Sequence, residues 1–374
     1  MRGLASLSLL SLCGLTVAQD LGVPLNWRKF SNDRPDSEII SISEAAIDAI
    51  LPKLKADIGE FDGIGYWQSG NVWASMANED YRAGTSKYRD QVVSQLKNVF
   101  NLRANYDQWA PCMFPSHLTQ ISYSPTSTSV VTNDAANSGS LPTKNFGFQG
   151  SCDGKTMAGG VFWKTDPADN AINSITTTLY MTLSAYLGEA TGDSKYISAA
   201  MLSANWVRDL NMKDNLVLDT IHANDCSRSP DNWLFTYNSG KFLEGLEILV
   251  DLTDDEGYRS LAANVANSAM KTGAWNRDDG VITEGASPNE NNDNVGFKSI
   301  LIRALDETYN RRKGDNEALR ILIHSYVCVQ MNALLDLAAD GNNYSSAWAG
   351  PAQGFTTWGQ MAALDVFVAA INAA

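Results

Sequence analysis

Aromatic and amide side chains recur in four segments of this sequence, each where a helix is expected to begin. Sugar-binding sites combine flat aromatic rings with amide and carboxylate groups, because a pyranose has an apolar face and a rim of hydroxyls. Any one of these tryptophans is more simply explained as a packing residue. Four such segments at equivalent helix ends nevertheless predict a shared carbohydrate-binding surface, with the candidate residues Tyr66, Trp67, Trp163, Tyr237, Asn238 and Trp358.

Adjacent acidic residues are the second group that could do chemistry, because cleavage of a glycosidic bond uses two carboxyl groups. The acidic pairs at 254–255 and 278–279 lie in turns between expected helices, where Asp commonly caps a helix or stabilises a turn. The pair at 79–80 lies within an expected helix, where we expect it to face solvent or to form part of the barrel wall. None of these pairs is therefore predicted to be catalytic.

The elements that would position these side chains are helices. Apolar residues recur at helical spacing in many segments, and no segment alternates with period two over a sustained run. Similar short turns recur, with 62 residues from Thr191 to Thr253 and 61 from Thr253 to Gly314, which indicates a repeated helical hairpin. The predicted helices are 42–58, 70–83, 87–100, 172–190, 194–209, 238–252, 256–271, 293–309, 315–339 and 356–373.

One hairpin is missing from this series. The interval from Thr85 to Thr191 is 106 residues, close to two units, yet no turn divides it. The stretch 109–148 is rich in Pro, Ser, Thr and Asn, a composition that opposes a long helix. We therefore predict an all-α, (α/α)6-type toroid without a sheet of more than two short strands. Its hairpin around 109–148 should be missing or disrupted, with that stretch poorly packed and the apolar faces of 87–100 and 172–190 exposed.

The N-terminus predicts secretion. A basic Arg2, an apolar run over 4–17 and a small-residue exit indicate a signal peptide over residues 1–18, followed by a single domain over 19–374. No other apolar run is long enough to predict a membrane span. The net charge is −14 without a Lys/Arg cluster, which argues against nucleic acid as a partner. We expect a monomer that uses no cofactor.

The cysteines fit an oxidising compartment. Cys152 and Cys226 lie in polar loops and are predicted to form a disulfide, whereas Cys328 lies on the apolar face of a helix and is predicted to be a buried free thiol. Their spacing matches no zinc pattern and the chain has only 3 His, so no metal site is predicted. Asn343 begins an Asn-Tyr-Ser glycosylation acceptor.

Several longer segments resemble the fungal branch of glycoside hydrolase family 76. The resemblance extends over residues 60–108 and 150–374, and it implies an (α/α)6 barrel and endo-acting, retaining hydrolysis of α-1,6-mannan by a secreted or cell-wall-associated protein. The segments are YWQSGNVWASMANEDY (66–81), SCDGKTMAGGVFW (151–163), DCSRSPDNWLFTYNSGKFLEGL (225–246), GVITEGASPNENNDNVGFKSILIRAL (280–305), RILIHSYVCVQMNALLDLA (320–338) and WAGPAQGFTTWGQMAALDV (348–366).

The resemblance also implies roles for particular residues. Glu284 and Asp293 match loop positions that face the substrate in this family. The family's catalytic pair is two adjacent aspartates shortly after the segment that matches 105–108, but here the chain continues as Trp-Ala-Pro-Cys over 109–112 and no such pair follows. The catalytic residues are thus unassigned, and Asp107 is the remaining carboxylate near the expected position.

Three interpretations of this departure stay open. The protein is a hydrolase of α-1,6-mannan, or it is a mannan-binding or defective member that lacks the catalytic pair. The third is that 109–145 reflects a wrongly joined reading frame. On the sequence as it stands, hydrolysis is predicted to be weak or absent.

Overall fold

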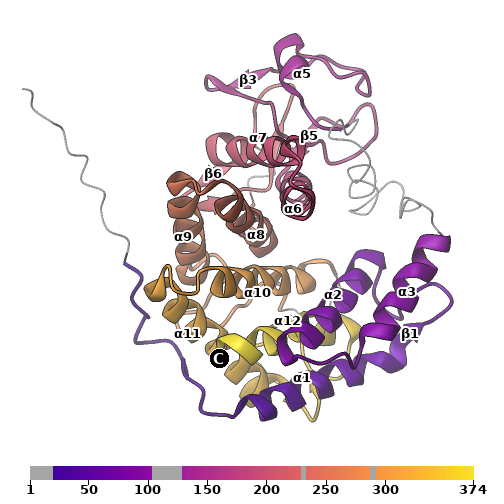
Figure 1. Ribbon diagram of the computed structural model, residues 1–374, viewed down its shortest axis with the longest axis vertical. Helices are drawn as coiled ribbons and strands as arrows, with labels where there is room; N and C mark the ends of the chain where they lie inside the picture. Colours follow the sequence, from indigo (N-terminus) through magenta and orange to yellow (C-terminus); the bar gives the residue numbers. More distant parts are fainter. Residues whose placement is uncertain (1–19, 103–128, 229–232, 287–291) are drawn as a thin grey trace, which may run out of the picture.

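The computed structural model of the 374-residue chain describes residues 20–102, 129–228, 233–286 and 292–374. Helices dominate these residues, as predicted (Figure 1). The helices are α1 (Asp36–Ile50), α2 (Tyr66–Ala83), α3 (Arg89–Leu102), α5 (Asn133–Ser138), α6 (Ser174–Thr191), α7 (Ser194–Leu210), α8 (Thr236–Thr253), α9 (Glu256–Lys271), α10 (Asn294–Arg311), α11 (Glu317–Ala333), which continues as a π-turn over Leu334–Ala338, and α12 (Thr357–Ala373).

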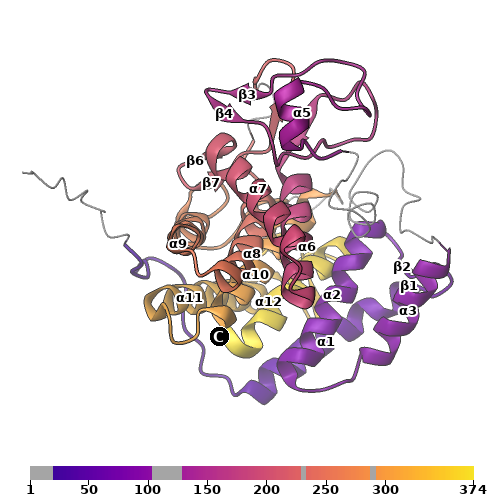
Figure 2. The same cartoon turned by 45° about the horizontal axis from the view of Figure 1, so that its top comes forward.

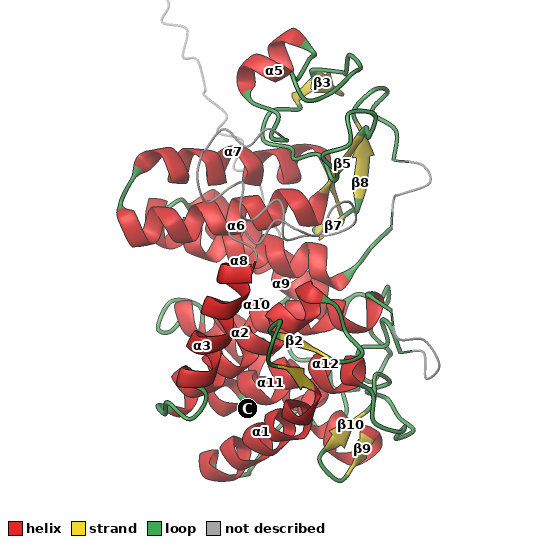
Figure 3. Ribbon diagram, turned by 90° about the vertical axis from the view of Figure 1, so that its right-hand side faces the viewer, coloured by secondary structure: helices red, strands yellow, loops and turns green. Residues whose placement is uncertain are grey.

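The strands are short, and every sheet within the described residues has two antiparallel strands. Figure 3 shows β5, β7 and β8 at the end of α6 that lies away from the α6–α7 turn. The pairs are β1 (Leu54–Lys55) with β2 (Glu60–Phe61), β3 (Ser151–Cys152) with β4 (Lys155–Thr156), β5 (Ala171–Asn173) with β8 (Thr220–His222), β6 (Met212–Lys213) with β7 (Leu216–Val217), and β9 (Ala339–Asp340) with β10 (Asn343–Tyr344).

The helices form an inner and an outer layer. Within the inner layer α6 packs on α8, α8 on α10, α10 on α12 and α12 on α2, while α7, α9, α11 and α1 pack outside them. Figures 1 and 2 show the C-terminal α12 lying beside α1 and α2, so the two ends of the helical series meet. This arrangement agrees with the (α/α)6 barrel that the family resemblance implies.

Burial distinguishes the two layers. Inner helix α8 buries nearly its whole circumference, since Phe242, Leu243 and Ile248 are all 0% exposed. Outer helix α9 buries only the stripe that contains Tyr258, Ala262, Val265, Ala266 and Ala269. A helix that is buried all round needs neighbours on every side, whereas an amphipathic helix needs them on one side, which is the difference between α8 and α9.

The predicted turns have the expected geometry. Gly192 ends α6 in the left-handed conformation at φ 67°, and Asp193 caps α7 by accepting a hydrogen bond from the Lys195 amide at 3.0 Å. Asp254 takes the place of that glycine at φ 52°, and Asp255 caps α9. The acidic pair at 254–255 is thus structural, as predicted.

Two expectations need correction. The first helix begins at Asp36 and ends at Ile50 instead of covering 42–58, because Pro52 follows in a 3-10 turn and residues 54–61 form the β1–β2 hairpin. The described part of the 109–148 stretch, residues 129–148, is irregular apart from α5 but is not poorly packed. Val131 is 0% exposed and Phe148 is 7% exposed within the main core.

The same residues explain why α6 is not exposed as predicted. Val130 packs against Tyr180 of α6, which is only 2% exposed. On α3, by contrast, Val93 is 43% exposed and Leu96 is 39% exposed, although Val92 and Val99 are buried, so the expectation for that helix is met in part. The predicted gap in the ring involves residues 103–128, which lie outside the described residues, and stays a prediction.

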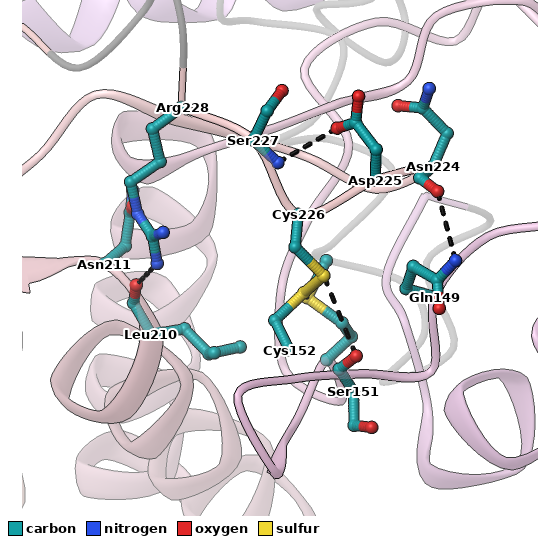
Figure 4. Close-up of a disulfide and its surroundings, with 11 residues drawn as sticks. Gln149, Ser151, Cys152, Leu210, Asn211, Asn224, Asp225, Cys226, Ser227 and Arg228 are labelled. Carbon is teal, nitrogen blue, oxygen red and sulfur yellow. Dashed lines mark hydrogen bonds between the residues drawn. A yellow bond between two sulfur atoms is a disulfide. The ribbon is translucent and has the colours of Figure 1, made fainter.

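The predicted disulfide is present. Cys152 and Cys226 are joined with a Cα–Cα distance of 5.8 Å, and they clip the β3 loop to the loop that follows β8 (Figure 4). The Gln149 amide reinforces this clip by donating to the Asn224 carbonyl at 3.2 Å. Cys328 is a buried free thiol, as predicted, and burial raises its pKa to about 12.

Among the residues that the structure describes, one helical stretch, Glu317–Ala338, has the length and composition of a membrane span, but 72% of its apolar window is buried inside the protein. It comprises α11 and the π-turn, and it packs against α12, α10 and α9. A core helix passes the same test, so the stretch is weak support for a span.

Candidate functional site

The inner helices are joined at their N-terminal ends by a buried carboxylate that the sequence analysis missed. Asp219, which precedes β8, is 7% exposed and accepts hydrogen bonds from the Asn238 amide of α8 at 2.9 Å and from the Asn173 amide at 3.3 Å. Asn173 is also the N-cap of α6. The Asp219 side chain therefore holds the first turns of α6 and α8 together.

A second carboxylate, Glu284, links α8 to α10. The N-cap of α8, Phe235, has no capping side chain, and Glu284 supplies the cap by accepting hydrogen bonds from the Thr236 amide at 2.9 Å and from the Thr236 hydroxyl. The residue as a whole keeps some exposed surface, but its carboxyl group is enclosed. Burial raises the pKa of Glu284 to about 7, against the opposing effect of its Thr236 hydrogen bonds.

Lys298 anchors the same loop from inside α10. Its ammonium group donates to the carbonyl of Glu284 at 2.9 Å and to the carbonyl of Ser346 at 2.7 Å, and it lies 5.0 Å from the ring centre of Trp348. Lys298 is 0% exposed, and burial lowers its pKa to about 7 although Glu284 favours its charged form. This lysine fixes the loops that precede α10 and α12.

Asp293 brings α2 to the same end. Its Oδ1 accepts hydrogen bonds from the indole of Trp67 at 3.2 Å and from the amide of Gln68 at 2.7 Å. Burial raises the pKa of Asp293, and these two hydrogen bonds oppose the rise. Nearby, the Thr357 hydroxyl of α12 donates to the Asp62 carbonyl at 2.6 Å, so the start of α12 also joins this end of the ring.

Tyr237 shows that the three carboxylates converge. The pKa of Tyr237 lies well above the ordinary tyrosine value, first because the side chain is buried and then because the negative charges of Asp219, Glu284 and Asp293 raise it further. The ring of Tyr237 stacks on Phe297 of α10 at 3.8 Å between ring centres, with 17° between the planes. Aromatic rings and carboxylates from α2, α8, α10 and the β7–β8 region thus share one location.

The predicted binding residues fall into two groups. Trp67, Tyr237, Asn238, Glu284 and Asp293 are brought together by the contacts above, with Tyr66 half-buried in the first turn of α2. The contacts above do not include the other two: Trp163 is 36% exposed and its amide pairs with the Ala171 carbonyl of β5, and Trp358 is 8% exposed in the first turn of α12. Their convergence on one concave surface stays a prediction.

Two other predicted residues have no described contact with this group. Asp107 is outside the described residues. Asn343 lies half-buried in the β9–β10 hairpin, paired with Asp340, and its glycosylation stays a prediction. No group of three His, Cys, Asp or Glu side chains in the described part of the chain could hold a metal ion.

Sequence signals for the missed residues exist in retrospect. Asp219 is the one acidic residue in the apolar run LVLDTI, and Lys298 interrupts the apolar face of α10 in FKSILIRAL. A lone charged residue in an apolar run is expensive to bury unless it has partners, so such positions mark polar networks.

The paired helices and this group of rings and carboxylates define an (α/α)6-barrel protein with the chemistry of a carbohydrate site. The chain belongs to glycosyl hydrolase family 76, because the family model matches residues 144–374. The family resemblance noted in the sequence is thereby confirmed, and the protein is classed as a glycoside hydrolase.

Individual relatives are more distant. Mannan endo-1,6-alpha-mannosidase DCW1 from Candida glabrata is 22% identical over 279 residues, which cover 67% of this chain and 60% of that protein. The match therefore spans less than two thirds of the relative.

Solved structures share the fold at low identity. The GH76A alpha-1,6-mannanase from Salegentibacter sp. HEL1_6 has a TM-score of 0.69 at 18% identity, covering 89% of this chain and 98% of that chain. An inactive variant of that enzyme, with two adjacent aspartates replaced, was solved in complex with alpha-1,6-mannotetrose. Dfg5 from Chaetomium thermophilum, in complex with glucosamine, has a TM-score of 0.69 at 14% identity, covering 91% and 92%.

Proposed function

We propose that the protein is a secreted glycoside hydrolase of the endo-acting, retaining type whose substrate is α-1,6-mannan. The observation that carries this proposal is a set of contacts at the start of the inner helices. Asp219 and Glu284 bind Asn238 and Thr236, the two neighbours of Tyr237, and Asp293 binds Trp67, which is next to Phe297 in the Tyr237 stack. Carboxylates accept hydrogen bonds from sugar hydroxyls, and aromatic faces cover the apolar face of a pyranose. A neutral polysaccharide also suits a chain with a net charge of −14.

The relatives support the choice of substrate. The printed names of DCW1 and of the Salegentibacter enzyme both specify α-1,6-linked mannan, and the latter was seen with an α-1,6-linked tetrasaccharide. Transfer of that specificity to this chain is our inference, and it rests on the shared family and on the site described above.

A second candidate function is mannan binding without efficient hydrolysis. Retaining hydrolysis needs two carboxyl groups about 5 Å apart, one as nucleophile and one as general acid/base. The sequence after Gln108 continues as Trp109-Ala110-Pro111-Cys112 and has no adjacent aspartates there. Loss of acid–base catalysis alone lowers a rate by roughly 10²–10⁴-fold. This absence favours slow turnover or binding alone.

One experiment separates the two candidates. The mature chain is incubated with purified α-1,6-mannan, and both the release of reducing ends and the retention of polysaccharide on the protein are measured. Short oligosaccharides with retained anomeric configuration would support the hydrolase. Retention without release would support the binding protein, and neither binding nor release would contradict both.

We also propose that the protein is secreted as a monomer and acts outside the cell or at the cell wall. The signal peptide predicted over residues 1–18 and the Cys152–Cys226 disulfide support an oxidising compartment. Mass spectrometry of the culture medium tests this. A mature N-terminus near Gln19 and a glycan on Asn343 are expected, and retention inside the cell would contradict the proposal.

A further inference from the structure

A row of aromatic rings extends outward from the carboxylate group. Trp67 lies 6.2 Å from Phe297, Phe297 lies 5.4 Å from Phe235, and Phe235 lies 5.9 Å from Trp233, between ring centres. Trp233 lies in the 225–246 segment of the family resemblance and is not one of the predicted binding residues. These four rings connect the Asp293 position to the surface.

Exposure changes along the row. Phe297 is 6% exposed because Tyr237 covers it, and Phe235 is half-buried, whereas Trp233 is 51% exposed. An exposed indole leaves a large apolar face in water. The inner rings serve as packing for the site, and the outer ring offers a free face beside it.

The backbone of Trp233 is fixed although its ring is exposed. The Trp233 carbonyl accepts a hydrogen bond from the amide of Asp219 at 3.0 Å, and the next residue, Leu234, forms a β-bridge with Leu218. The peptide that carries the indole is therefore tied to the same carboxylate residue that joins α6 and α8. Fixing the backbone in advance lowers the entropic cost of binding to the ring.

We propose that Trp233, supported by Phe235, is an outer platform for one sugar residue of an α-linked mannan chain. That sugar lies beyond the sugar that contacts Asp293. This inference rests on the proposed function and adds to it the residue that confers preference for longer chains. A polysaccharide is the occupant that fits, because the exposed ring is continuous with hydrogen-bonding groups for sugar hydroxyls and the acidic protein disfavours polyanions.

Binding of α-1,6-linked manno-oligosaccharides of two, four and six residues, measured by calorimetry, tests the platform. Trp233→Ala is expected to weaken binding of the four- and six-residue chains by about five- to tenfold while changing disaccharide binding less than about twofold. Trp233→Phe should retain most of the affinity for the longer chains. The matched control is Tyr81→Ala, which removes an aromatic ring that is 76% exposed at the other end of α2.

The outcomes separate this inference from the function beneath it. If the wild-type protein binds the oligosaccharides and Trp233→Ala binds every length as the wild type does, the platform is wrong and the proposed substrate stands. An equal loss for all three lengths also overturns the platform, because it places the indole at the inner sugar. If the wild type binds none of them, both proposals fall. A thermal unfolding curve matching that of Tyr81→Ala excludes misfolding as the cause of a loss.

Discussion

The two ends of the helical ring treat their buried carboxylates differently. At the turn end, where the inner helices finish, arginines neutralise them. Arg82 of α2 pairs with Asp306 of α10 at 2.8 Å, and Arg312, which follows α10, pairs with Glu247 of α8. Positive side chains at helix C-termini also complement the helix dipoles.

At the end where the inner helices begin, neutral groups satisfy the carboxylates. Glu284 accepts from Thr236, Asp293 accepts from an indole and an amide, and Asp219 accepts from two asparagines. A tightly paired arginine is difficult to displace, whereas hydroxyl, amide and indole donors can be shared with or exchanged for sugar hydroxyls. We propose that the turn end serves stability and that the other end binds sugar.

The largest expected effect is at the turn end. Arg312 is 4% exposed and pairs with Glu247, which is 1% exposed and whose other oxygen has no hydrogen-bond partner. Arg312→Ala should lower the free energy of unfolding by about 3–5 kcal/mol, because it leaves a buried carboxylate without a counter-charge. Urea unfolding measures this loss.

The control for this change is Arg259→Ala, because Arg259 pairs with three exposed carboxylates, Asp254, Glu256 and Asp315, which are 91%, 79% and 39% exposed. Its cost should stay below about 1 kcal/mol. Both variants should bind mannotetraose as the wild type does. If Arg312→Ala weakens binding in the folded protein, the assignment of this end to stability alone is wrong.

One buried carboxylate near the turn end, Glu79, has no arginine partner among the described residues. Glu79 of α2 is 0% exposed, and neither carboxylate oxygen has a hydrogen-bond partner. Burial raises the pKa of Glu79 to about 7. The charges of Glu44, Asp80 and Asp48 add to this rise, and the charge of Lys87 opposes it. The folded state thus holds a proton that the unfolded state releases near pH 4.5. Glu79 therefore lowers the free energy of unfolding progressively as pH rises from about 4.5 to 7. Below that window it has no such effect, because it is protonated in both the folded and the unfolded state.

Glu79→Gln should therefore stabilise the protein by about 1–3 kcal/mol at pH 8 and change little at pH 4. Urea unfolding at the two pH values measures the difference. Glu38→Gln, at a side chain that is 52% exposed, is the control and should show no such pH dependence. Equal effects of Glu79→Gln at both pH values would show that Glu79 does not carry a raised pKa.

At the binding end, a cap is expected to matter for function as well as stability. Glu284→Ala removes the cap of α8 and should cost about 1–2 kcal/mol of stability, together with about a tenfold loss of mannotetraose affinity, since the first turn carries Tyr237 and Asn238. Asp255→Ala removes the cap of α9 at the turn end and should cost a similar amount of stability. It should leave the affinity unchanged. Equal losses of affinity in both variants would mean that general destabilisation explains the effect.

The helices were predictable because burial repeats along the chain with helical period, as in α9, and because Gly and Asp mark the turns. The disulfide was predictable because both cysteines lie in polar loops. The true start of α1 was not, since its first turn has few apolar residues before Ile39. Nor were the partners of Asp219 and Lys298, because their contacts join residues far apart in sequence and depend on how the loops pack. The packing of 129–148 depends on tertiary contacts with α6 that override an unfavourable composition.

We predict that mannan binds where the inner helices begin and not at the turns. Hydrogen exchange of the wild-type protein with and without α-1,6-mannotetraose tests it directly. We predict that the ligand slows exchange in segments 64–70, 233–240 and 292–300, and leaves the turns at 191–193, 253–255 and 311–316 unchanged. Protection confined to the turn segments, or spread equally over both ends, would contradict the account.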